Sequence, residues 1–128
     1  MRYQFTLLQD CLRAEMIGRE TVEETQDFIA AVADEARKHN ASRILICVRR
    51  SRPIFRVEQY RISEQFRVLG ANPAVRVALV ADTDEIRAAH GYIEVLAKQH
   101  EANVRAFRDE PSAIEWLRAA TLQSQEKR

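Results

Sequence analysis

The sequence predicts one α/β domain: a mixed, mostly parallel sheet of five strands with an amino-terminal hairpin and about four helices. Apolar and β-branched runs alternate along the chain with longer segments of helical periodicity, a pattern typical of parallel strands joined by helices. Two further strand-like runs follow one another closely at the amino terminus, which indicates an antiparallel pair. The sheet should therefore be mixed.

The amino-terminal hairpin is expected within residues 3–20. The stretches YQFTLLQ and LRAEMIG each alternate apolar with polar side chains, and such alternation predicts a strand with one buried face. The turn between the two strands is expected near residues 9–11.

The following segment, ETVEETQDFIAAVADEARKHN, is predicted to be a helix. Thr21 and Glu24 have the spacing of a capping box at its start. The residues at 38–40, Lys-His-Asn, suit its carboxyl-terminal end. Its apolar residues share one helical stripe, made of Val22, Phe28, Ile29, Val32 and Ala36.

Three apolar runs mark the remaining strands: RILICVR at 43–49, VRVALVAD at 75–82 and the weaker NVRAFRD at 103–109. Continuous apolar runs indicate strands that are covered on both faces. Helices are expected at 57–69, at 84–99 and from Pro111 onward, because apolar residues recur there at helical spacing and proline favours the first helical position.

Length and composition indicate one globular domain. The chain has 128 residues, of which 46% are hydrophobic and 30% are charged, and its formal net charge is +1. This length supports one sizeable core, so we assign residues 1–120 to the domain and residues 121–128 to a polar tail. The balanced charge gives no global attraction to nucleic acid or to anionic lipid.

The expected location is the cytoplasm, without integral membrane association. No apolar run is long enough to span a bilayer, and Gln9, Asp10 and Arg13 interrupt the region where a signal peptide needs an apolar stretch. Cys11 and Cys47 are far apart in the sequence, which fits unpaired thiols in a reducing compartment.

The carboxyl-terminal part of the sequence carries a family resemblance. RVALVAD followed by a helix, and then ANVRAFRDEPSAIEWL, resemble the SpoIIAA-like branch of the STAS-type fold. In that family a strand ending in phenylalanine is followed by a short acidic turn and by a helix that closes on alanine, tryptophan and leucine. We expect the terminal helix to be held across the sheet by Phe107, Ile114, Trp116 and Leu117.

The resemblance implies two kinds of function. In anti-sigma-factor antagonists of the STAS fold, a serine after the strand that corresponds to RILICV is phosphorylated. Ser51 lies in the corresponding region, VRRSRPIFRVEQ, although arginines replace the aspartate and the glycine of the family motif. The distant kinship to CRAL-TRIO lipid-exchange domains instead implies a small apolar or lipid-like ligand, in a pocket lined by Phe55, Phe66 and Trp116.

Arginine is concentrated between residues 43 and 76, where eight arginines accompany only two acids, Glu58 and Glu64. Guanidinium groups suit bidentate capture of phosphate or carboxylate. We therefore expect an anion-binding or partner-binding site at Arg49, Arg50, Ser51, Arg52 and Arg56. Alternatively, these arginines are solvated or pair with the acidic helix at residues 20–35, in the same molecule or in a second one. Pairing between subunits predicts a homodimer.

Catalysis and metal binding find little support in the sequence. His39, His90 and His100 lack the spacing of metal ligands, and no nucleophile elbow, P-loop or dinucleotide-binding glycine motif is present. Residues 82–84, Asp-Thr-Asp, follow a predicted parallel strand but suit a helix cap. No interleaving of aromatic and basic residues marks nucleic-acid binding. We expect a non-enzymatic regulatory or protein-interaction module without a metal or cofactor.

Overall fold

The computed structural model describes residues 1–9, 11–52, 74–99 and 101–126. The predicted helix at 57–69 lies outside these residues. None of the described helices is long and apolar enough to cross a membrane. Along the chain the elements are β1 (Arg2–Leu7), β2 (Leu12–Ile17), α1 (Val22–Lys38), β3 (Arg43–Arg49), β4 (Arg76–Ala81), α3 (Asp84–Gln99), β5 (Val104–Phe107) and α4 (Glu110–Glu126).

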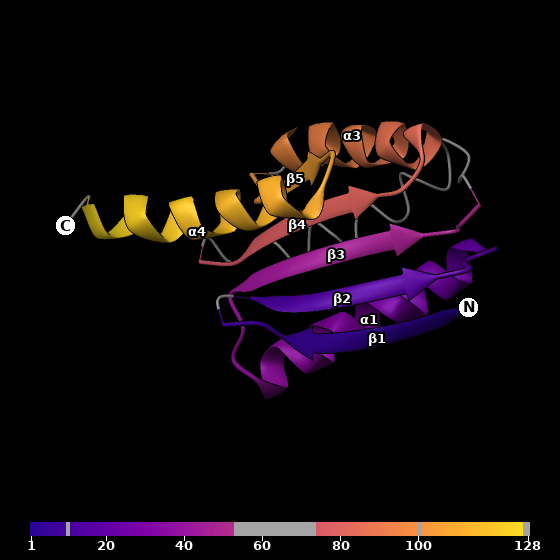
Figure 1. Ribbon diagram of the computed structural model, residues 1–128, viewed down its shortest axis with the longest axis horizontal. Coiled ribbons are helices and arrows are strands. Elements are labelled where there is room, and N and C mark those ends of the chain that lie inside the picture. Colours follow the sequence, from indigo (N-terminus) through magenta and orange to yellow (C-terminus); the bar gives the residue numbers. More distant parts are fainter. Residues whose placement is uncertain (10, 53–73, 100, 127–128) are drawn as a thin grey trace.

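The five strands form one sheet in the order β1-β2-β3-β4-β5. β1 and β2 are antiparallel, with Leu7 opposite Leu12 beside the turn, and every other pair is parallel. The predicted mixed, mostly parallel sheet is therefore confirmed. Because β2, β3, β4 and β5 run in the same direction, their carboxyl ends meet at one edge of the sheet (Figure 1).

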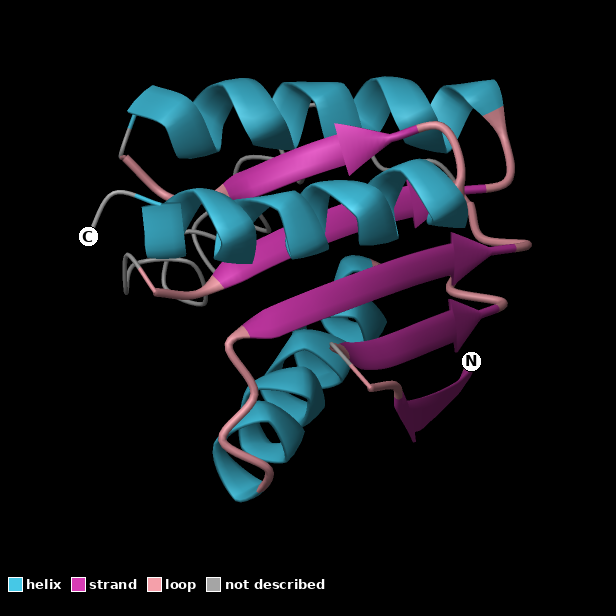
Figure 2. Cartoon of the chain, turned by 60° about the vertical axis from the view of Figure 1, so that its left-hand side comes forward, coloured by secondary structure: helices cyan, strands magenta, loops and turns pink. Residues whose placement is uncertain are grey.

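Helices pack on both faces of the sheet, α1 and α3 on one face and α4 on the other (Figures 1 and 2). On the first face, Phe28 of α1 and Ile86 of α3 join alternate strand residues such as Ile44 and Leu79 in the larger core. The smaller core lies beneath α4 and contains Cys11, Leu45, Cys47, Ala78, Val80, Ala113 and Leu117. α4 packs mainly against β4, with further contacts to β3 and β5.

Side-chain caps fix the starts of α1 and α3. Thr21 and Glu24 form the predicted capping box, in which each side chain accepts a hydrogen bond from the other residue's backbone N–H. Thr83 Oγ1 accepts a hydrogen bond from Ile86 N at 3.2 Å. The interpretation of residues 82–84 as a helix cap is therefore confirmed at Thr83.

The start of α4 differs by one residue from the prediction. Asp109 Oδ1 accepts a hydrogen bond from Ser112 N at 2.9 Å, so the helix begins at Glu110 and Pro111 is its second residue. Proline is tolerated there because the N–H groups of a first helical turn have no partner inside the helix.

α4 is held on the sheet by the apolar residues that the sequence predicted. Leu117 is fully buried, and Phe107, Ile114 and Trp116 pack against the same core. Trp116 lies at the margin of this core, with its ring 5.4 Å from that of Phe107 and the Arg76 guanidinium 5.3 Å from its centroid. The helix continues to Glu126, into the stretch assigned from the sequence to a polar tail.

Candidate functional site

The predicted site residues lie where β3 ends, at the carboxyl edge of the sheet. We call residues 49–52 the arginine loop. Gly18 N donates to Arg49 O at 3.0 Å, and Arg52 N donates to Arg19 O at 2.9 Å. These bonds join the loop to the segment that follows β2, so the backbone of the loop is held in one position.

Arg50 and Arg52 are the exposed residues of the arginine loop. Arg50 adopts a left-handed backbone conformation with φ at 49°, and its N–H donates to Asp82 Oδ2 at 3.1 Å. This bond ties the loop to the end of β4. Within the part of the chain that the structure describes, neither guanidinium group forms an ion pair. Both are therefore available to an acidic group from outside.

Ser51 is half-buried, and its hydroxyl group is already engaged. Ser51 Oγ donates to Arg49 O at 3.0 Å and accepts from Arg19 N at 3.2 Å. In the unmodified chain this hydroxyl therefore helps to hold the arginine loop. A phosphoryl group on Ser51 would have to replace these contacts.

Arg49 belongs to a network of ion pairs on the face of the sheet that carries α4. We call Arg13, Glu15, Arg49 and Glu110 the ion-pair network. Arg13 Nε lies 2.7 Å from Glu110 Oε1, and Arg13 Nη2 lies 3.0 Å from Glu15 Oε2. Arg49 Nε lies 2.8 Å from Glu15 Oε2, and Arg49 Nη2 lies 2.9 Å from Glu110 Oε2. Each arginine thus contacts both carboxylates.

One alternative from the sequence, pairing of the arginines with the acidic helix at residues 20–35 of the same molecule, is not what the structure shows for Arg49. The side chain of Arg49 lies on the same face as Glu15, because Glu15 is level with Cys47 in the parallel register and residues two apart share a face. α1, with its acidic first turn, packs on the opposite face (Figures 1 and 2). Arg49 is consequently engaged in ion pairs within the chain, although 42% of its side chain remains exposed.

The ion-pair network favours the charged forms of Arg13, Glu15 and Glu110. The hydrogen bond to Glu110 is the main cause that raises the pKa of Arg13. Burial alone would raise the pKa of Glu15, but Arg13, Gln4 and Arg49 together hold it below its ordinary value. The hydrogen bond from Arg13 is the main cause that lowers the pKa of Glu110. Both carboxylates are therefore ionised at neutral pH.

A second polar group is buried on the side of α1 and α3, and the sequence did not identify it. We call it the Arg19–His90 pair. Arg19 is 5% exposed and His90 is 4% exposed. Arg19 Nη1 donates to Thr25 Oγ1 at 3.4 Å, and Arg19 Nη2 donates to the carbonyl oxygen of Arg52. Arg19 thus links α1 to the arginine loop.

One region of the chain matches a known family and contains the arginine loop, the ion-pair network, Arg19 and His90. A family profile described as SpoIIAA-like matches residues 11–118. The chain belongs to the SpoIIAA-like family. None of the curated proteins compared with the chain matches it.

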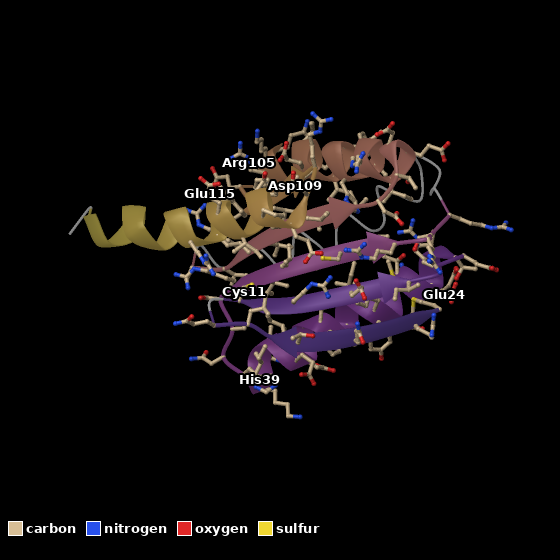
Figure 3. The ribbon with its side chains drawn as sticks, in the orientation of Figure 1. Cys11, Glu24, His39, Arg105, Asp109 and Glu115 are labelled. Carbon is tan, nitrogen blue, oxygen red and sulfur yellow. The ribbon has the colours of Figure 1, made fainter. Side chains whose placement is uncertain are left out.

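The SpoIIAA-like chain has a cleft of about 390 Å³ at the carboxyl edge of the sheet, beside the start of α4 where Figure 3 shows Asp109. Its charged lining residues are Arg49, Arg87, Arg108, Asp82, Asp109 and Glu110. Two of the arginines are already paired, Arg49 in the ion-pair network and Arg87 with Asp84 at 2.8 Å. Because the charges in its lining balance, the cleft does not select an anion.

Reactive groups are few in the described part of the SpoIIAA-like chain. Cys11 and Cys47 are buried and form no disulfide within the described residues, and burial, together with the charge of Glu110, raises the pKa of Cys47 to about 12. Cys47 therefore remains a thiol at neutral pH. Within the same residues, no three histidine, cysteine, aspartate or glutamate side chains are grouped as metal ligands.

Three predicted residues, Phe55, Arg56 and Phe66, lie outside the described residues. Trp116, the third residue proposed to line an apolar pocket, contacts Phe107 and Arg76 at the edge of the α4 core. Its position gives no support to the lipid-like ligand.

Proposed function

We propose that this SpoIIAA-like chain is a non-enzymatic regulatory module that binds an acidic surface of a protein partner through Arg50 and Arg52. The arginine loop carries the proposal, because its two exposed guanidinium groups project from a backbone fixed by hydrogen bonds. A loop that is already ordered loses little conformational entropy on binding. Family membership supports a regulatory or interaction role.

The chemistry of arginine defines the partner surface. A guanidinium group presents planar donors that match a carboxylate with two parallel hydrogen bonds. Two such groups in one short loop suit a partner that carries at least two neighbouring aspartate or glutamate side chains. Charge pairs of this kind raise the association rate, and salt weakens them.

The same loop gives a basis for a homodimer. Glu23 and Asp27 in the first turns of α1 are exposed, and their spacing places them on one side of the helix. Glu20, just before the helix, is exposed as well. Since the arginine loop and the start of α1 lie at the same edge of the sheet (Figure 1), a two-fold arrangement would pair each loop with the partner subunit's α1. In this proposal the acidic residues of α1 compete with the external partner for the loop.

The module acts without catalysing a reaction, and it works in the cytoplasm. The thiol of Cys47 is held protonated by burial, and burial with the nearby charge of Arg19 lowers the pKa of His90 to about 3, so neither group suits acid-base or nucleophilic chemistry near neutral pH. Two buried cysteines that are not joined in a disulfide suit a reducing compartment.

Charge reversal of the loop tests the proposal. The immobilised wild-type chain and an Arg50→Glu/Arg52→Glu variant are each incubated with extract of the source organism, and the retained proteins are quantified by mass spectrometry. At least one protein retained by the wild type should fall about tenfold or more on the variant, and high salt should release it. The thermal unfolding midpoint should not change, because both side chains are exposed and unpaired.

A matched control changes the net charge equally at the opposite edge of the sheet. Lys38 and Lys98 are exposed in the last turns of α1 and α3, and the Lys38→Glu/Lys98→Glu variant should retain the wild-type set of proteins. Equal retention on the wild type and the loop variant would refute the proposed role of Arg50 and Arg52. Sedimentation velocity on the same variants checks the pairing through the loop, which the loop reversal should abolish and the control should preserve.

A further inference from the structure

β1 leaves one edge of the sheet open. In the strand order it has β2 on one side and none of the described strands on the other (Figure 1). An open edge strand presents unpaired N–H and C=O groups, and proteins commonly protect such strands with charged residues, proline or a bulge. The stretch from Tyr3 to Leu7 has neither a charged residue nor a proline, and it pairs with β2 in an unbroken register. β1 therefore lacks the usual protection.

The hydrogen-bond pattern of the hairpin shows which backbone groups of β1 face outward. Leu8 N donates to Cys11 O at 2.9 Å, so Leu8 and Cys11 form a hydrogen-bonded pair. Such pairs alternate with non-hydrogen-bonded pairs along antiparallel strands. Counting back from Leu8 in the register with β2 makes Tyr3, Phe5 and Leu7 members of the second kind. Their N–H and C=O groups consequently point away from β2, toward the open edge.

Apolar side chains accompany these outward-facing backbone groups. Tyr3, Phe5 and Leu7 share one face of the strand, because alternate residues do. The ring of Tyr3 lies 5.6 Å from that of Phe5 and 5.7 Å from that of Phe28 in α1. Phe5 is partly buried against the larger core, but 45% of Tyr3, 57% of Leu7 and 37% of Leu8 remain exposed. β1 thus extends the core beneath α1 with exposed apolar surface.

We propose that β1 is a homodimer interface, at which a second copy of the chain adds its own β1 antiparallel to the first. One two-fold arrangement uses every outward-facing residue. With Phe5 on the axis, Phe5 lies opposite its counterpart, and Tyr3 lies opposite Leu7 of the partner subunit. These are all hydrogen-bonded pairs, and each exchanges two backbone hydrogen bonds. The two sheets join into one, with the α1 helices of both copies on the same face.

The side chains of β1 complement those of a second copy. A hollow of about 360 Å³ lies at the start of the strand and is lined by Met1, Arg2, Tyr3, Gln4 and Ile17. In the proposed register, Leu7 and Leu8 of the partner subunit lie opposite Tyr3 and Arg2, so the exposed leucines of one copy come next to the hollow of the other. The two Arg2 side chains fall at opposite ends of the interface, so like charges do not meet. This self-complementarity favours a second copy over a strand of another protein.

The interface at β1 is separate from the arginine loop and does not depend on it. Its contacts are backbone hydrogen bonds and buried apolar side chains, whereas salt weakens the charge pairs of the loop. Together, the two contacts would link dimers into larger assemblies at low salt. The Arg50→Glu/Arg52→Glu variant lacks the pairing through the loop but keeps β1 unchanged, so it isolates the contact through β1.

Sedimentation velocity in the Arg50→Glu/Arg52→Glu background and high salt tests the interface. We expect a dimer, and Leu7→Lys should raise its dissociation constant by about tenfold or more, because lysine on an edge strand opposes pairing. Leu7 is exposed, so the unfolding midpoint should change little. The matched control is Val95→Lys, which should leave the dissociation constant unchanged. Val95 is 52% exposed on α3, which packs on β4 and β5 at the other end of the sheet.

Amide hydrogen exchange tests the geometry in the same background without any substitution in β1. The amides of Gln4 and Thr6 bond to β2 and should exchange slowly in the dimer and in the monomer. Those of Tyr3, Phe5 and Leu7 should exchange slowly only in the dimer, and dilution to the monomer should accelerate them by about tenfold or more. This alternation distinguishes pairing through β1 from any other dimer.

Three results would overturn the proposal. The first is a monomer at every concentration, and the second is a dimer in which the amides of Tyr3, Phe5 and Leu7 exchange rapidly. The third is an equal effect of Leu7→Lys and Val95→Lys on the dissociation constant. If the chain is a monomer and Leu7→Lys loses a protein that the wild type retains from cell extract, the edge pairs with a strand of another chain, and a second copy is not its occupant.

Discussion

The buried and half-buried arginine side chains on the two faces of the sheet differ in whether they contact carboxylates. In the ion-pair network, Arg13 and Arg49 each contact the carboxylates of Glu15 and Glu110. Arg19 is more deeply buried, and its acceptors among the described residues, Thr25 and the Arg52 carbonyl, are neutral. The ion-pair network balances its charges within the chain, whereas the charge of Arg19 has no ion-pair partner among the described residues.

Removing one carboxylate from the ion-pair network should have the largest effect on stability. In Glu15→Gln, both Arg13 and Arg49 lose a counter-charge while most of Arg13 remains buried. We expect the free energy of unfolding to fall by about 2 kcal/mol, less than for a fully buried pair because Arg49 is partly exposed. Urea denaturation measures this loss. The exposed Glu115 on α4 (Figure 3) is the control, since Glu115→Gln should change stability by less than about 0.5 kcal/mol.

Replacing an arginine by methionine on each face tests whether paired and unpaired arginines contribute differently to stability. Arg13→Met leaves two carboxylates with one arginine and should cost about 2 kcal/mol. Arg19→Met removes an uncompensated charge, which offsets the loss of its hydrogen bonds to Thr25 and Arg52, and should cost less than about 1 kcal/mol. Equal losses for the two variants in urea denaturation would show that Arg19 is as fully compensated as Arg13.

The smallest effect is the dependence of stability on pH near His90. The pKa of His90 is lowered from 6.5 to about 3 in the folded chain, mainly by burial, so the unfolded chain binds a proton first as the pH falls. Stability from this group is present above the unfolded value and is lost below it. Between about pH 6 and pH 5, the wild type should lose about 1 kcal/mol more than His90→Leu. Parallel stability curves for the two proteins would contradict the neutral, buried state of His90.

The sequence predicted the fold more completely than the site. The strand at 43–49 and the helix at 84–99 have the predicted bounds, because unbroken apolar runs and helical stripes are local patterns. The capping box at Thr21 is equally local. Pro111 falls one position later in its helix than predicted, since the side chain of Asp109 fixes the start.

The polar groups depend on contacts between distant parts of the chain, which local patterns do not reveal. Glu110 is 97 residues from Arg13, and only the packing of α4 brings them together. A signal for half of the ion-pair network was present, because Arg13 and Glu15 alternate with buried apolar residues in β2 and must share a face. His90 lies one turn of helix from Ile86 and three residues before Ile93, both buried, so its own burial could have been predicted.

The most direct test of the contrast between the two faces is to measure the mass of the protein, with any bound ligand, after purification from its own cells. The wild type and Arg19→Met are expressed in the source organism, purified without organic acids in the buffer, and weighed by native and then by denaturing mass spectrometry. Because Arg19 has no counter-charge among the described residues, the account predicts that the two proteins carry the same bound small molecules, or none. A small acid that denaturation releases from the wild type and not from Arg19→Met would show that the charge of Arg19 is balanced, and would contradict the contrast.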